Sequence, residues 1–174
     1  MNRSRRLLLS VLFVPAAAIG GETRDCPFAG GSGASSGHRH AGDAAGRETA
    51  GMGFSPTATT HHFLLAADGG SIEVAANDVG DGATRDQIRM HLTHVREMFA
   101  AGDFSIPMFV HDTLPPGVST MKRRAAAIRY SYEDLAGGGR IRLSTADADA
   151  RDAIHDFLRF QIREHGTGDP LATR

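Results

Sequence analysis

The stretch TTHHFLLAADGGSIEVAA, residues 59–76, decides the fold because it predicts a β-hairpin. Its two strand-like runs, 59–66 and 71–76, flank the turn sequence DGG. A second hairpin is predicted from AAIRYSYEDL and RIRLSTA, residues 126–135 and 140–146, where apolar side chains alternate around a glycine-rich turn. Each hairpin precedes a segment with helical periodicity, so we expect the order strand, strand, helix to occur twice.

Each predicted helix has a start signal and one apolar stripe. A T-x-x-Q capping box at Thr84 predicts that the first helix begins at Arg85. Asp147 or Asp149 can cap the second helix. The apolar positions follow spacings of three and four, which predict one buried face per helix: Ile88, Leu92, Val95 and Phe99 in the first, and Ile154, Phe157, Leu158 and Ile162 in the second.

The two halves share the pattern RD-x-I…L…GD, at residues 85–103 and 151–169, with every matched pair 66 residues apart. This similarity predicts an internal ββα-ββα repeat. We expect an α+β fold in which a four-stranded antiparallel sheet carries both helices on one face. The single domain is expected to span residues 53–169, followed by a frayed tail at 170–174.

The N-terminal residues predict export. A basic start, the short apolar run LLLSVLFV and an A-x-A motif predict a signal peptide over residues 1–18. SRRLLL resembles a twin-arginine signal, so export by either the Sec or the twin-arginine route is expected, to the periplasm or the medium. Residues 19–52, rich in Gly, Ala and Ser, are expected to form a disordered tether. Cys26 is the only cysteine, which excludes an intramolecular disulfide.

Composition narrows the function classes. A net charge of -1 argues against a nucleic-acid-binding protein. The apolar run near the N-terminus is too short for a membrane span, and we expect no membrane anchor. Nine histidines in 174 residues are many, and neutral imidazole is a common metal ligand.

The segment RMHLTHVREM, residues 89–98, is the best candidate for a metal-binding face. In a helix its histidines and Met98 form a stripe beside the apolar face. Imidazole with thioether sulfur favours copper, and imidazole alone would suit zinc. A complete site needs ligands from elsewhere. The expected ligands are His91, His94, Met98, Met108 and His111, with His61, His62 and Met121 as further options. The alternative is that these side chains are only the polar flank of a packed helix.

The runner-up function is a metal-free protein- or ligand-interaction domain that uses the proline-rich loop over residues 104–121. The residues expected to form that surface are Pro107, Asp112, Pro115, Pro116 and Lys122. A small hydrolase or transferase is the third alternative, with His111 beside Asp112 as base and orienting group. No G-x-S-x-G motif or phosphate-binding glycine loop supports it, so a non-enzymatic role is expected.

Three stretches, MGFSPTATTHHF, FSIPMFVHDTLPPGVSTMKR and IHDFLRFQIREHGTGD, resemble a family of small exported bacterial proteins of unknown function. The resemblance covers about residues 52 to 169 and implies no established activity, site or cofactor. Some members carry the name aspartate carbamoyltransferase. That enzyme has two larger α/β domains and an S-T-R-T phosphate-binding motif, whereas this chain has STAD and STMK, so we do not expect the name to describe it.

Overall fold

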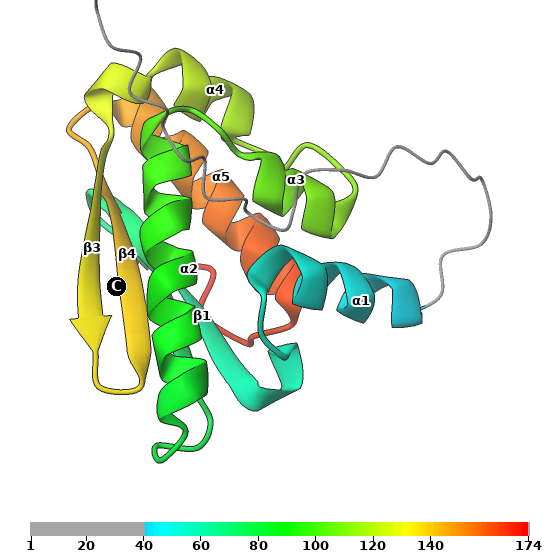
Figure 1. Cartoon of the computed structure of the whole chain (residues 1–174). Helices are drawn as coiled ribbons and strands as arrows, with labels where there is room; N and C mark the ends of the chain where they lie inside the picture. The colour runs from blue at the N-terminus through cyan, green and yellow to red at the C-terminus, as the bar shows by residue number, and fades with distance from the viewer. Residues whose placement is uncertain (1–40, 174) are drawn as a thin grey trace, which may run out of the picture. The chain divides into compact units, whose positions relative to one another are not determined.

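The computed structural model describes residues 41–173. The predicted signal peptide, the first part of the predicted tether and Cys26 lie outside the described residues. Within them the fold is α+β, with helices packed on a four-stranded antiparallel sheet (Figure 1).

The sheet consists of the two predicted hairpins. Its strands are β1 (Thr59–Ala66), β2 (Gly69–Ala76), β3 (Arg129–Leu135) and β4 (Gly138–Ser144), in the order β1-β2-β4-β3. Alternate side chains point into the core, as period-two patterning requires. The buried ones are Phe63, Leu65, Ile72, Val74, Ile141 and Leu143. The second face carries the polar residues of the same strands, including the Glu73–Arg140 ion pair.

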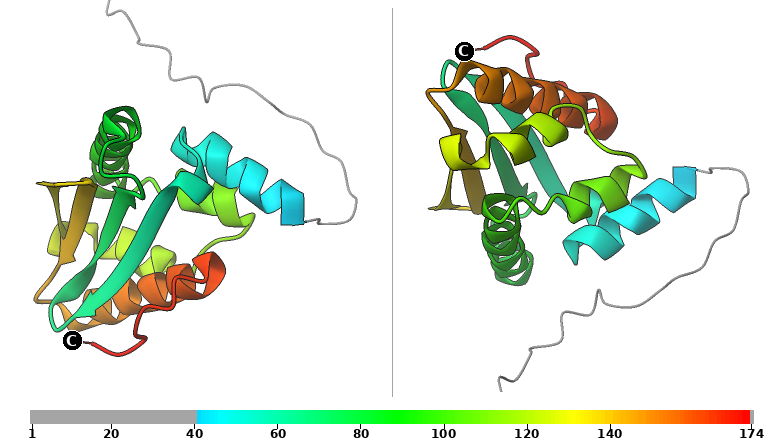
Figure 2. Two further views of the ribbon diagram at one scale, coloured as in Figure 1. Left: turned by 90° about the horizontal axis from the view of Figure 1, so that it is seen from below. Right: turned by 90° about the horizontal axis from the view of Figure 1, so that it is seen from above.

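Both long helices cover the same face of the sheet, as predicted (Figure 2). Helix α2 (Gly82–Ala100) lies mainly against β3 and β4, and α5 (Ala148–His165) against β1 and β2. Their apolar stripes meet, because Phe99 of α2 contacts Phe157 of α5 edge-on with ring centroids 5.9 Å apart. Every residue predicted in the two stripes is buried.

The capping box predicted at Thr84 is wrong. Helix α2 begins three residues earlier than Arg85, at Gly82, because the Asp81 carboxylate accepts a hydrogen bond from the Thr84 backbone N–H at 2.9 Å. Asp147 caps α5 in the same way, accepting from Ala150 N–H at 2.8 Å. A carboxylate at the N-cap also interacts favourably with the helix dipole.

The internal repeat stays a prediction. The two capping residues, Asp81 and Asp147, keep the offset of 66 seen in the sequence. The central strands do not, because β2 begins at Gly69 and β4 begins at Gly138, an offset of 69. The connection from hairpin to helix is therefore shorter in the second half.

The segment predicted as a proline-rich loop over residues 104–121 contains most of two short helices, α3 (Ser105–His111) and α4 (Val118–Arg123). Each is under eight residues, too short to show a clear apolar period. Pro107 is compatible with α3 because it lies in the first turn, where a backbone N–H has no helical acceptor. Short 3-10 turns at Pro56–Ala58 and Ala125–Ala127 precede β1 and β3.

The second part of the predicted tether is a helix, α1 (Ala41–Met52), so the expectation of disorder does not hold for these residues. Both views in Figure 2 show α1 beside α3. Arg47 Nε donates to the Val110 carbonyl at 3.2 Å, and Met52 packs against the hydrophobic core. Tertiary contacts therefore stabilise a sequence whose composition alone does not favour order.

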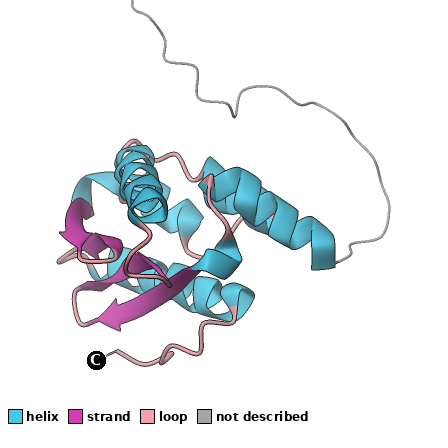
Figure 3. Ribbon diagram, turned by 60° about the horizontal axis from the view of Figure 1, so that its bottom comes forward, coloured by secondary structure: helices cyan, strands magenta, loops and turns pink. Residues whose placement is uncertain are grey.

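The C-terminal segment is fastened to edge strand β1 (Figure 3). Asp169 accepts hydrogen bonds from the Phe63 backbone N–H and from the His62 ring, both at 2.9 Å. Further on, Arg159 Nε donates to the Leu171 carbonyl at 3.0 Å, so part of the tail predicted to be frayed is held against α5. Among the described helices, none is both long and apolar enough to cross a membrane.

Candidate functional site

The five predicted metal ligands do not come together. Of them, only His91 lines the cavity described below. On the same helix His94 is exposed and Met98 is half-buried, while Met108 on α3 is 36% exposed. His111 is buried, but its Nε2 donates to Gln161 Oε1 at 2.9 Å. That bond, rather than one to the adjacent Asp112, fixes the His111 ring.

The three additional candidates also separate. His61 points to the helix-covered side of the sheet and lines the cavity. His62, its neighbour on β1, points to the other side and bonds to Asp169. Met121 has no exposed surface and belongs to the apolar core.

The residues of the predicted partner loop lie in different structural environments. Pro107 is buried and lines the cavity, and Pro115 is fully buried. Asp112 ends α3 in the left-handed conformation, with φ of 50°. Pro116 and Lys122 are exposed.

A cavity of about 80 Å³ lies between the sheet and the helices. Its walls come from α1, β1, β2, α2, α3 and α5. Most of its lining is apolar, from residues such as Val74, Leu92 and Phe157. The exceptions carry nitrogen or sulfur: Met52, His61, His91, Gln161 and His165.

His165 is the centre of a cluster of rings. Its ring lies parallel to that of His61, at an interplanar angle of 9° and a centroid distance of 5.7 Å. The His111 ring meets it edge-on at 5.0 Å. Phe54 links the third cavity histidine to this cluster, since it contacts His91 edge-on at 5.5 Å and stacks on His61 at 6.4 Å.

The three cavity histidines are neutral at pH 7. Burial, followed by the proximity of other histidines, lowers the pKa of His61 and of His91 to about 4 and that of His165 to about 3. A neutral imidazole has a nitrogen lone pair that can bind a metal or accept a hydrogen bond without first losing a proton.

Carboxylates lie behind two of the rings. Glu48 Oε1 is 3.5 Å from His165 Nδ1, and Glu164 Oε2 is 4.0 Å from His111 Nδ1. A carboxylate beside His165 Nδ1 favours the tautomer in which Nε2 is free to bind a metal, whereas His111 Nε2 already bonds to Gln161. Glu48 and Met52 both come from α1, so this helix contributes to the site.

Gln161 carries an unsatisfied buried polar atom. Its side chain is 3% exposed and lines the cavity. The oxygen accepts from His111, but Nε2 is the only buried side-chain nitrogen or oxygen without a hydrogen-bond partner in the described part of the chain. Native structures seldom leave such a donor unpaired, and each case calls for an explanation.

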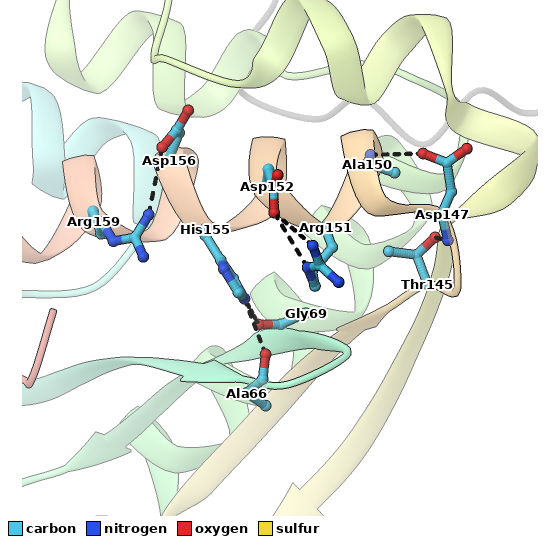
Figure 4. A network of polar contacts seen from close by, with 10 residues as sticks. All are labelled: Ala66, Gly69, Thr145, Asp147, Ala150, Arg151, Asp152, His155, Asp156 and Arg159. Carbon is cyan, nitrogen blue, oxygen red and sulfur yellow. Dashed lines mark hydrogen bonds and ion pairs between the residues drawn. The ribbon is translucent and has the colours of Figure 1, made fainter. Parts of the chain in front are cut away.

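Sequence reasoning missed four residues of this site: Glu48, Met52, Gln161 and His165. His165 and Gln161 share the cavity-facing side of α5 at a spacing of four, which was the available signal. That signal is weak, because histidines on a helix often have structural roles. His155 shows this in Figure 4, where Nε2 lies 2.9 Å from the Ala66 carbonyl and 3.0 Å from that of Gly69.

In residues 41–173, no group of three or more His, Cys, Asp or Glu side chains already has the arrangement of a metal site. Comparisons with protein-family models, with curated proteins and with solved structures found no match.

Proposed function

We propose that this protein is an exported binding protein that holds copper, as Cu(I), in the cavity between α1, β1 and α5. Its ligands are His61, His165 and the Met52 thioether. The observation that carries the proposal is that two partly buried imidazoles, 5.7 Å apart between ring centroids, and one thioether line the same small cavity. Burial lowers the pKa of both imidazoles, which therefore present neutral nitrogens.

Distance supports this assignment. Two imidazoles that share one ion at metal–nitrogen distances of about 2 Å have ring centroids roughly 5 to 6.5 Å apart. The centroids of His61 and His165 are 5.7 Å apart. Because the two rings are stacked at an interplanar angle of 9°, the proposal requires a change of rotamer that aims both lone pairs at one ion.

Ligand type favours copper over zinc. Thioether sulfur is a soft ligand that selects Cu(I), whereas structural zinc takes four ligands from Cys, His, Asp or Glu. The cavity lining contains Met52 and neutral imidazoles, and neither a thiolate nor a carboxylate. Two imidazoles and one thioether suit the low coordination number that Cu(I) accepts.

The test is Cu(I) affinity, measured anaerobically by competition with a chromophoric chelator on protein without an affinity tag. A Cys26→Ser background removes the only thiol as a competing ligand. We expect one copper per chain, with affinity at least about tenfold weaker in His61→Phe, His165→Phe and Met52→Leu.

The matched controls are His94→Phe and Met90→Leu, since His94 is exposed and Met90 is 71% exposed. Both should bind copper like the parent protein. X-ray absorption should detect nitrogen and sulfur neighbours, and the sulfur should disappear in Met52→Leu. Copper that stays bound equally well in all three ligand variants, or no copper binding by the parent, would overturn the proposal.

A protein-interaction role for residues 104–121 is the second candidate. Met108 and Leu114 favour it, because these large apolar side chains are 36% and 49% exposed. A Met108→Ser/Leu114→Ser variant that loses a copurifying partner but keeps its copper affinity would support this role.

A further inference from the structure

Gln161 has an unpaired amide nitrogen beside the proposed copper site. Gln161 lines the cavity, and its Nε2 is buried and lacks an acceptor within the described residues. His111 holds the amide in place by donating to its oxygen at 2.9 Å. A residue of the cavity wall therefore carries a fixed, unpaired donor, and leaving such a donor without an acceptor is costly.

Charge leads to the same conclusion. His61, His165 and Met52 are all neutral ligands, so a copper ion bound by them would keep its positive charge in a mostly apolar cavity. A buried charge without compensation is strongly unfavourable. The carboxylate nearest to these rings, Glu48, lies behind His165 and outside the cavity lining.

We propose that the cavity binds a small monovalent anion beside the copper ion and that Gln161 Nε2 donates a hydrogen bond to it. This inference rests on the proposed copper site. The anion completes the coordination of the ion, neutralises its charge and satisfies the buried amide.

Volume limits the anion to a few atoms. One water-sized group needs about 10–15 Å³ of cavity volume measured with a water-sized probe. The cavity of about 80 Å³ therefore accommodates the ion and a halide or a similarly small anion, but not a large organic ligand.

The experiment measures Cu(I) affinity in bromide and in perchlorate, which coordinates copper weakly. An anion that binds together with the ion raises the apparent Cu(I) affinity as its concentration increases. Each variant is compared with the parent in the same buffer, so formation of copper–bromide complexes in solution cancels.

Two variants isolate the amide donor. Gln161→Leu removes it without adding a copper ligand, and Gln161→Glu keeps an acceptor for His111 while placing a negative charge at the cavity. Gln87→Leu, at an exposed glutamine of α2, is the matched control. If Gln161→Leu fails to fold, Gln161→Glu still decides the question.

We expect bromide to strengthen copper binding by the parent and by Gln87→Leu about tenfold or more relative to Gln161→Leu, as removal of a hydrogen bond to a charged group implies. Gln161→Glu should bind copper more tightly than the parent in perchlorate and show no bromide effect. X-ray absorption at the copper edge should detect bromide in the parent. Tight copper binding with the same bromide response in parent and variants would refute the anion site alone, whereas absence of copper binding would refute the proposed function and this inference together.

Discussion

Acidification should destabilise this protein mainly through its cavity histidines. The pKa of an unfolded histidine is near 6.5, and in the folded chain burial lowers it to about 4 for His61 and His91 and to about 3 for His165. Below pH 6.5 the unfolded chain therefore binds more protons than the folded chain. The stabilisation is fully present above pH 6.5 and is lost as the pH falls toward the folded-state values.

The magnitude follows from the width of that window. A difference of one pKa unit corresponds to about 1.4 kcal/mol, so each histidine that stays neutral between pH 6.5 and pH 5 lowers the free energy of unfolding by about 2 kcal/mol. Three such histidines lower it by about 6 kcal/mol, comparable to the total stability of many domains. We expect the urea midpoint to fall steeply between pH 7 and pH 5.

The assay is urea unfolding of the metal-free protein at several pH values, with His165→Phe as the test variant. Phenylalanine preserves a ring next to His61 but cannot bind a proton. The decrease in the free energy of unfolding between pH 7 and pH 5 should therefore be smaller by about 2 kcal/mol in this variant. His94→Phe changes an exposed residue and serves as the control. Equal pH dependence in the parent and His165→Phe would refute the conclusion that a buried neutral His165 contributes to acid sensitivity.

Three further changes test the fold by urea unfolding. Asp169→Ala should lower the free energy of unfolding by about 1–3 kcal/mol, because the Phe63 N–H on edge strand β1 loses its acceptor. Gly117→Ala should lower the free energy of unfolding more than a typical surface substitution, because Gly117 has φ of 82° and an added Cβ would lie 2.0 Å from the Ala153 carbonyl oxygen. Unchanged stability would show that α4 and α5 can move apart at little cost. Asp81→Ala should lower stability by about 1 kcal/mol through loss of the α2 cap, and no loss would show that another group caps the helix.

Local patterns were sufficient to predict the hairpins and the two long helices. The stripe from Ile88 to Phe99 and the alternation in β1 and β4 each lie within one element, so their periods can be read directly from the sequence. The register between β2 and β4 could not be predicted in this way. It joins Ile72 to Ile141 across the chain and depends on how both hairpins pack against the helices.

The site was harder to predict than the fold because its residues come from distant parts of the sequence. His61 and His165 are 104 residues apart and meet only because α5 lies over β1. The spacing argument that favoured His91 and His94 used neighbours on one helix, and a helix turns the second of these toward solvent. Met52 and Glu48 were missed because the composition around them predicted disorder.

Departures from ordinary core packing gather at one place in the described part of the chain. Histidines whose pKa values are lowered by burial, an unpaired buried amide and a small cavity each reduce stability, and all of them meet around His165 and Gln161. The rest of the core has the regular apolar packing of Ile88, Ile141 and Leu158. Natural sequences tend to keep such locally unfavourable features where a function requires them. If these features had only a structural role, Gln161→Leu and His165→Phe would stabilise the metal-free protein and leave metal binding unchanged. Under the two proposals, His165→Phe also weakens copper binding, and Gln161→Leu weakens the binding of the accompanying anion.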